Sequence, residues 1–68
     1  MKFERQIKAL SELSWHIKDE IDRTEVVLRE ETISGTYRAY LEMWIEHQRE
    51  EMRINLDAVV ILMRNTHV

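Results

Sequence analysis

The chain has no cysteine, no proline and a single glycine, Gly35, among its 68 residues. Without cysteine, neither a disulfide nor a thiolate metal site can stabilise the fold. Proline is absent and glycine occurs once, near the middle, so few residues interrupt a helix in either half. A chain this short buries little apolar surface. Its stability must therefore come from long helices, a His/carboxylate metal site or self-association.

Long apolar runs and a strong excess of one charge are also missing. The longest unbroken apolar run, Ala58 to Met63, is too short for a membrane helix or for the core of a signal peptide. The 13 acidic and 10 basic residues give a net charge of −3, and the two signs are interleaved. This pattern argues against nucleic acid as the main partner. We expect a cytoplasmic protein.

Apolar residues recur in alternating steps of three and four through both halves of the chain, which is the spacing of one face of an α-helix. The first half predicts a helix over residues 2–32, with seam positions Phe3, Ile7, Leu10, Ser14, Ile17, Ile21, Thr24 and Leu28. The second half predicts a helix over residues 36–65, with seam positions Leu41, Ile45, Gln48, Met52, Asn55, Val59 and Leu62. The predicted fold is therefore a single all-α domain spanning residues 1–68.

The predicted turn, residues 33–35, contains Ser34 and Gly35. Gly35 can adopt a left-handed backbone at little steric cost, and Ser34 or Thr36 can cap the first amides of the second helix. A link this short makes the two helices antiparallel. The sequence therefore predicts a coiled-coil-like antiparallel helical hairpin.

The register of this hairpin follows from the numbering, because opposed residues in an antiparallel pair have numbers with a constant sum. Placing Leu28 opposite Leu41 brings every seam position of the second helix opposite a seam position of the first, and Phe3 opposite Thr66. The same register places Ser14 opposite Asn55. We expect these two residues to form a hydrogen-bonded layer that fixes the register.

The second helix carries a further stripe at helical spacing, which the first helix cannot cover. Its members are Tyr37, Tyr40, Trp44, His47, Glu51, Ile54, Ala58 and Ile61, flanked on the first helix by Leu13 and Val27. Left in water, this face would be an unusually large apolar patch. The economical solution is a homodimer, in which two hairpins pack into a four-helix bundle.

A twofold axis near Arg49 makes this face complementary to itself. It pairs large side chains with small ones and places His47 opposite Glu51 of the second copy. In outline, the assembly resembles small helical-hairpin dimers that control plasmid or phage processes by binding RNA or other proteins. The resemblance is one of architecture, because no residue motif carries a family assignment.

Metal binding and catalysis are weaker hypotheses. His16 and Glu20, like His47 and Glu51, lie one turn apart on one face, as ligands of a bundle metal site do. Di-iron carboxylate bundles use Glu-x-x-His, however, and neither histidine has a glutamate three residues before it. A cysteine nucleophile and a Gly-rich phosphate loop are both absent. We expect no metal, no cofactor and no catalytic residue.

Trp15 falls on the flank opposite the proposed dimer face, where an exposed tryptophan is unexpected. Either it packs over the edge of the seam against Leu56, or it anchors a heterologous protein partner. The expected function is that of a small non-enzymatic regulator or adaptor, acting by protein binding as a homodimer. The alternatives are a nucleic-acid-binding regulator and a His/Glu metal-binding bundle.

Overall fold

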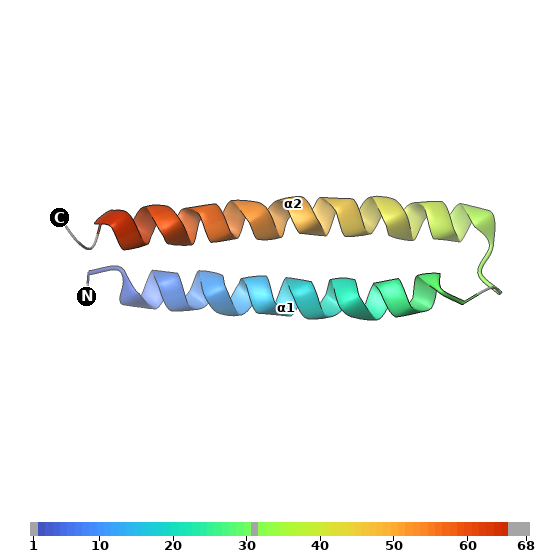
Figure 1. Cartoon of the computed structure of the whole chain (residues 1–68), viewed down its shortest axis with the longest axis horizontal. Coiled ribbons are helices and arrows are strands. Elements are labelled where there is room, and N and C mark those ends of the chain that lie inside the picture. Colours follow the sequence, from blue (N-terminus) through green and yellow to red (C-terminus); the bar gives the residue numbers. More distant parts are fainter. Residues whose placement is uncertain (1, 31, 66–68) are drawn as a thin grey trace.

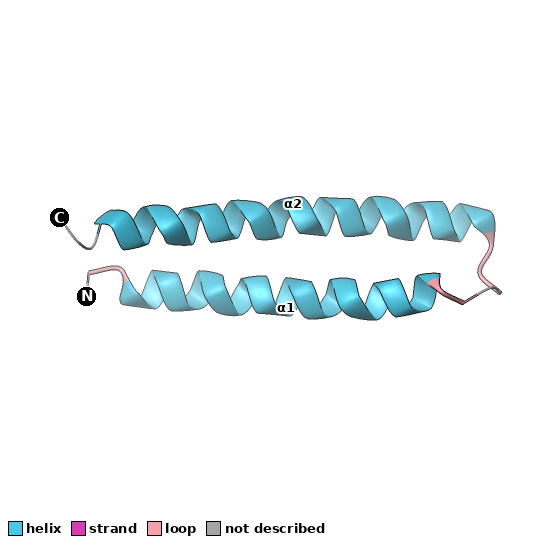
Figure 2. Ribbon diagram, viewed as in Figure 1, coloured by secondary structure: helices cyan, strands magenta, loops and turns pink. Residues whose placement is uncertain are grey.

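A computed structural model describes residues 2–30 and 32–65 and contains two helices, α1 (Glu4–Leu28) and α2 (Gly35–Asn65). The helices lie side by side and run antiparallel, with the start of α1 and the end of α2 at one end of the molecule and the connection at the other (Figure 1). Outside the helices, the described residues form only turn and loop (Figure 2). The predicted all-α helical hairpin is confirmed, and the four-helix bundle remains a prediction.

The interface between α1 and α2 follows the predicted seam. Every predicted seam position, in both helices, is buried or half-buried. The centre is a cluster of Ile17, Ile21 and Ile45, against which Leu28, Trp44 and Met52 pack. Burying one such aliphatic side chain contributes about 1.5–3 kcal/mol to folding. This seam is therefore what holds the hairpin together.

Helix α1 is shorter at both ends than the predicted range of residues 2–32. At its C-terminal end, the amides of Arg29 and Glu30 donate to carbonyls three residues earlier, at 3.1 and 3.0 Å. Such bonds tighten and close the last turn of a helix. The sequence pattern gave no sign of this end, because charged residues without a helix breaker follow Leu28 directly.

The end of α1 is held by a residue of α2. The guanidinium of Arg38, half-buried, donates hydrogen bonds to the carbonyl oxygens of Leu28 and Glu30. These carbonyls therefore have partners without a further turn of helix. Because the donor comes from the other side of the loop, the helical periodicity of α1 could not reveal it.

The prediction of a left-handed Gly35 is wrong. Gly35 is the first residue of α2, and no residue in the described ranges has a positive φ. The connection begins just after Leu28 and is longer than predicted, so the chain reverses without a left-handed backbone at Gly35. Of the two capping candidates, Ser34 is the one used: its Oγ accepts a hydrogen bond from the Tyr37 amide at 3.2 Å.

The predicted Ser14–Asn55 hydrogen bond is not formed. The hydroxyl of Ser14 donates instead to the carbonyl of Leu10, one turn earlier in the same helix, at 2.9 Å. The preceding turn offers a carbonyl to any serine or threonine in a helix, so a buried hydroxyl needs no partner across the seam. The register thus rests on the fit of apolar side chains.

The hairpin is long and thin, measuring 53 × 14 × 11 Å over its Cα atoms. Its radius of gyration is 15.8 Å, whereas a compact domain of this length has one of about 11 Å. In the described part of the chain, no helix combines the length and the apolar character that crossing a membrane requires. Two helices alone leave many apolar side chains in contact with water.

Candidate protein-binding surfaces

The predicted dimer face lies open along one side of the hairpin, and we call it the tyrosine face. It consists of the α2 residues Tyr37, Tyr40, Trp44, His47, Glu51, Ile54, Ala58 and Ile61, flanked by the α1 residues Leu13 and Val27. Tyr40 is 62% exposed, Ile61 57% and Ile54 53%, and only Trp44 and Ala58 are half-buried. A single hairpin therefore leaves this face uncovered at both of its ends.

Near the turn, the tyrosine face begins with a pair of stacked rings. The centroids of Tyr37 and Tyr40 are 6.4 Å apart and their planes differ by 13°. Stacking favours this relative position of the two rings, so less side-chain freedom is lost when another molecule covers them. Exposed, pre-ordered aromatic rings are a common feature of protein-binding surfaces.

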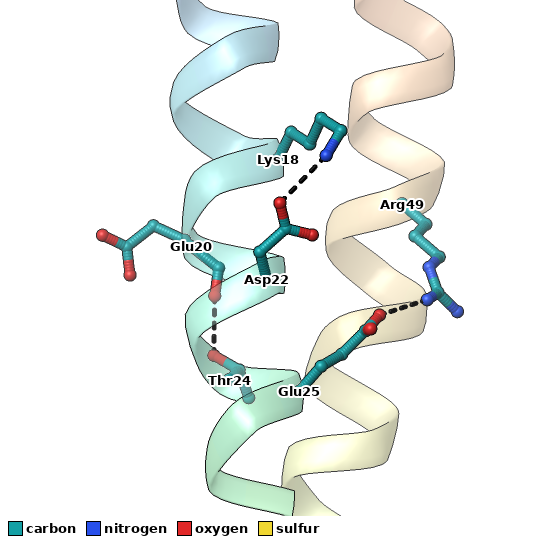
Figure 3. Close-up of polar contacts among 6 residues, drawn as sticks. All are labelled: Lys18, Glu20, Asp22, Thr24, Glu25 and Arg49. Atoms are coloured by element: carbon teal, nitrogen blue, oxygen red, sulfur yellow. Dashed lines mark hydrogen bonds and ion pairs between the residues drawn. The ribbon is translucent and has the colours of Figure 1, made fainter.

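The middle of the tyrosine face is ionisable. His47 Nε2 lies 3.4 Å from Glu51 Oε1 one turn later in the same helix. The carboxylate of Glu20 points away from α2 (Figure 3), and His16 is exposed. No three His, Asp or Glu side chains of the described residues converge in one hairpin as metal ligands would.

On the opposite side of the hairpin, Trp15 lies at the edge of a groove between the helices, which we call the Trp15 groove. The groove has a volume of about 260 Å³ and is lined by Ser11, Ser14, Trp15, Lys18, Met52 and Leu56. Trp15 and Leu56 thus line the same groove from different helices. One of the two predictions for Trp15 placed it over the edge of the seam against Leu56. Trp15 nevertheless remains 70% exposed, so the hairpin does not bury its ring.

A second depression on this side lies nearer the turn, and we call it the acidic hollow. It is lined by Glu25, Leu28, Glu42, Ile45, Glu46 and Arg49 and has a volume of about 340 Å³. Glu25 forms an ion pair with Arg49 across the two helices (Figure 3). Glu42 and Glu46 are exposed and form no ion pair with any described residue.

Most basic side chains in the middle of the hairpin are held by carboxylates. Lys18 pairs with Asp22 at 2.9 Å (Figure 3), and this hydrogen bond raises the pKa of the lysine. Arg23 pairs with Asp19 at 2.9 Å. A positive charge already paired with a carboxylate attracts phosphate weakly, so these contacts give a nucleic-acid interface little support.

Arg53 of α2 is held in the same way. Its guanidinium binds the carboxylate of Glu50 and, at 3.0 Å, that of Asp57. The hydrogen bonds between Arg53 and Glu50 lower the pKa of the Glu50 carboxyl. The same bonds raise the pKa of the Arg53 guanidinium. This network occupies one side of α2, and its two carboxylates outweigh the single positive charge of Arg53.

Sequence reasoning located the tyrosine face and Trp15 but missed both depressions and the contacts of Arg38. The spacing of residues in the sequence shows which of them share a helix face. It does not show where the surfaces of two packed helices separate and leave a depression. A signal for the Glu25–Arg49 pair was present, because both residues flank the seam on the same side and their long side chains can span the five-residue offset between them. Comparison with known protein families, curated proteins and solved structures finds no match to this chain. Its function is therefore inferred from these surfaces.

Proposed function

We propose that this protein is a small cytoplasmic regulator or adaptor without enzymatic activity, which acts by binding protein as a homodimeric four-helix bundle. The observation that carries the proposal is the open tyrosine face. Its apolar side chains Tyr40, Ile54 and Ile61 are more than half exposed, although their helical spacing is that of a buried stripe. Covering them with a second copy removes a patch that a stable monomer rarely keeps in water.

The surface area of the hairpin supports self-association. The chain exposes 5577 Å², whereas a compact monomer of its mass exposes about 4,600 Å². The excess, about 1,000 Å², is close to the roughly 800 Å² that each partner buries in a standard interface. Dimerisation would therefore bring the exposed surface of each chain close to that of a compact protein.

The tyrosine face is also complementary to itself. In an antiparallel twofold pairing of the two α2 helices, Tyr40 packs against Ala58 and Trp44 against Ile54 of the second copy. Large side chains thus meet smaller ones, as close packing requires. His47 lies opposite Glu51 of the second copy, so the ionisable groups in the middle can form two further ion pairs.

The dimer is tested by placing a charge on the tyrosine face. Ile54→Asp should yield a monomer by sedimentation equilibrium, because the carboxylate would be buried against Trp44 of the second copy. The matched control is Val26→Asp, since Val26 is 55% exposed and lies on the outer side of α1. The control should remain a dimer, and both variants should keep their helical circular dichroism. A dimeric Ile54→Asp protein would contradict the proposed interface.

The register of the dimer has its own test. Glu51→Lys should weaken the dimer by removing the attraction between His47 and Glu51 of the second copy. The double variant His47→Glu/Glu51→Lys exchanges the two charges and should restore the dimer. Glu42→Lys, which changes a glutamate on the opposite side of the hairpin, should have little effect. Failure of the double variant to restore the dimer would overturn this register.

A further inference from the structure

The side of the hairpin opposite the tyrosine face, which we call the groove face, carries two unlike features. The Trp15 groove lies toward the chain ends, and the acidic hollow lies toward the turn. Leu56 lines the first and Glu46 the second. Ten residues of α2 separate them, which corresponds to about 15 Å along the helix axis. A partner helix of three to four turns would reach both.

The groove end of this face offers an apolar anchoring site. Trp15 is 70% exposed and forms one wall of the groove, with Met52 and Leu56 from α2 opposite. Val60, also exposed, extends the apolar surface toward the chain ends. A tryptophan at the edge of an apolar groove is the kind of residue that contributes most to binding energy in protein interfaces.

The other end of this face carries a net negative charge, because three glutamates and one arginine line the acidic hollow. Glu42 and Glu46 are one turn apart on α2, so their carboxylates lie on the same side of the helix. Arg49 is already paired with Glu25. The guanidinium of Arg38, one turn before Glu42, donates to two backbone carbonyl oxygens at the end of α1. A partner that places lysine or arginine side chains here would complement these two carboxylates, which pair with no described residue, and also the net charge of −3.

A second copy of this chain fits the groove face poorly. An antiparallel twofold pairing would place the Trp15 groove of one copy over Glu42 and Glu46 of the other, apolar against acidic. The tyrosine face has no such conflict, because it is apolar at both ends. The groove face therefore stays free in the proposed dimer and is available to a different protein.

We propose that the groove face binds an amphipathic helix of a partner protein. An apolar side chain of that helix enters the Trp15 groove, and basic side chains about three turns away along the same stripe contact Glu42 and Glu46. The two helices together provide an elongated surface with two depressions, and helix-in-groove recognition uses such a surface. This inference rests on the proposed function, because it requires the tyrosine face to be occupied by the second copy.

The test is a selection from a library of random helical peptides on the intact protein, followed by affinity measurement of the enriched peptides. The enriched peptides should carry an apolar cluster and, about three turns away on the same face, lysine or arginine. Trp15→Ala should weaken their binding about 10- to 30-fold. Glu42→Gln/Glu46→Gln should weaken it about tenfold and abolish most of its dependence on salt between about 50 and 500 mM.

The control for the charge variant is Glu50→Gln/Asp57→Asn. It removes the same charge from the Arg53 network on the outer side of α2 and should leave peptide binding unchanged. Enriched peptides that bind the Trp15 and Glu42/Glu46 variants as well as the native protein would overturn the inference, as would a selection that enriches no peptide. Because the glutamine variant alters only exposed side chains, it remains informative if Trp15→Ala fails to fold.

Sedimentation of the same variants separates this inference from the proposed function. Both should remain dimers, since neither Trp15 nor Glu42 lies on the tyrosine face. If the peptide result is negative while the proteins are dimeric, only the helix-binding inference fails. If the native protein is a monomer and Ile54→Asp abolishes peptide binding, the peptides occupy the tyrosine face and both proposals fail.

Discussion

The guanidinium of Arg38 donates a hydrogen bond to the carbonyl oxygen of Leu28, so the second turn of α2 holds the last residue of α1. A second bond joins Arg38 to the carbonyl of Glu30 at 2.9 Å. With the cap that Ser34 provides to the Tyr37 amide, these contacts satisfy backbone groups on both sides of the turn. The link between the helices is therefore held by side chains.

Replacing Arg38 with alanine leaves the carbonyls at the end of α1 without their protein donor. We expect Arg38→Ala to lower the free energy of unfolding by about 1–2 kcal/mol, the range for hydrogen bonds that involve a charged group at a partly exposed site. Arg38→Lys keeps the charge but loses the forked geometry, so its effect should be smaller. Urea unfolding measures both. An alanine variant as stable as the native protein would show that water replaces Arg38 without loss.

Gly35 should tolerate a side chain, because it begins α2 with a negative φ. An added Cβ would meet no atom within 4 Å. Gly35→Ala should therefore raise the free energy of unfolding by about 0.4–1 kcal/mol, because alanine restricts the unfolded chain. Thermal unfolding of the two proteins checks this. A loss of stability would mean that the turn needs a left-handed glycine after all.

Ser14 and Ile21 are equally buried, each 4% exposed, but they should respond differently to alanine. Among the described residues, Ser14 bonds only to Leu10 in its own helix, so Ser14→Ala should change stability by less than about 0.5 kcal/mol. Ile21→Ala opens a cavity in the central cluster and should cost about 2–5 kcal/mol. Urea unfolding of both variants compares them. A large loss in the serine variant would indicate a polar contact across the seam.

The Glu50–Arg53 contact gives a prediction for acid. Arg53 lowers the pKa of the Glu50 carboxyl in the folded protein. A lowered carboxyl pKa stabilises the fold above the ordinary value, about 4.3, and this contribution disappears as pH falls through the folded-state pKa. Stability should therefore fall less steeply below about pH 5 in Glu50→Gln than in the native protein. The difference between the two proteins should be small, because Glu50 and Arg53 are both exposed. Identical acid unfolding curves for the two proteins would contradict the prediction.

The seam could be predicted because helical periodicity is a local property. Whether Ile21 or Leu41 faces the other helix depends on spacing alone, and a constant sum of opposed residue numbers then fixes the register. The end of α1 and the backbone of Gly35 could not be predicted in this way. Both depend on how the loop closes, and Arg38 contributes to that closure from the other helix.

The binding surfaces were only partly predictable, for a related reason. Spacing placed Tyr40 and Ile54 on a second stripe and Trp15 on the opposite flank, and the structure leaves all three exposed. Spacing could not show that Trp15 and Leu56 border one groove, or that Glu46 lines a depression nearer the turn. The two depressions lie where the surfaces of α1 and α2 separate at the edge of the seam. Their size and position depend on the shapes of the side chains as well as on their spacing in the sequence.

The central claim is that α2 packs on two sides, against α1 and against a second copy. Sedimentation equilibrium of the native protein over a range of concentrations tests it most directly. We predict a mass twice that of the 8.3 kDa chain, with dissociation only on dilution. A mass of 8.3 kDa at every concentration, with Tyr40 and Ile54 in contact with water, would contradict the account.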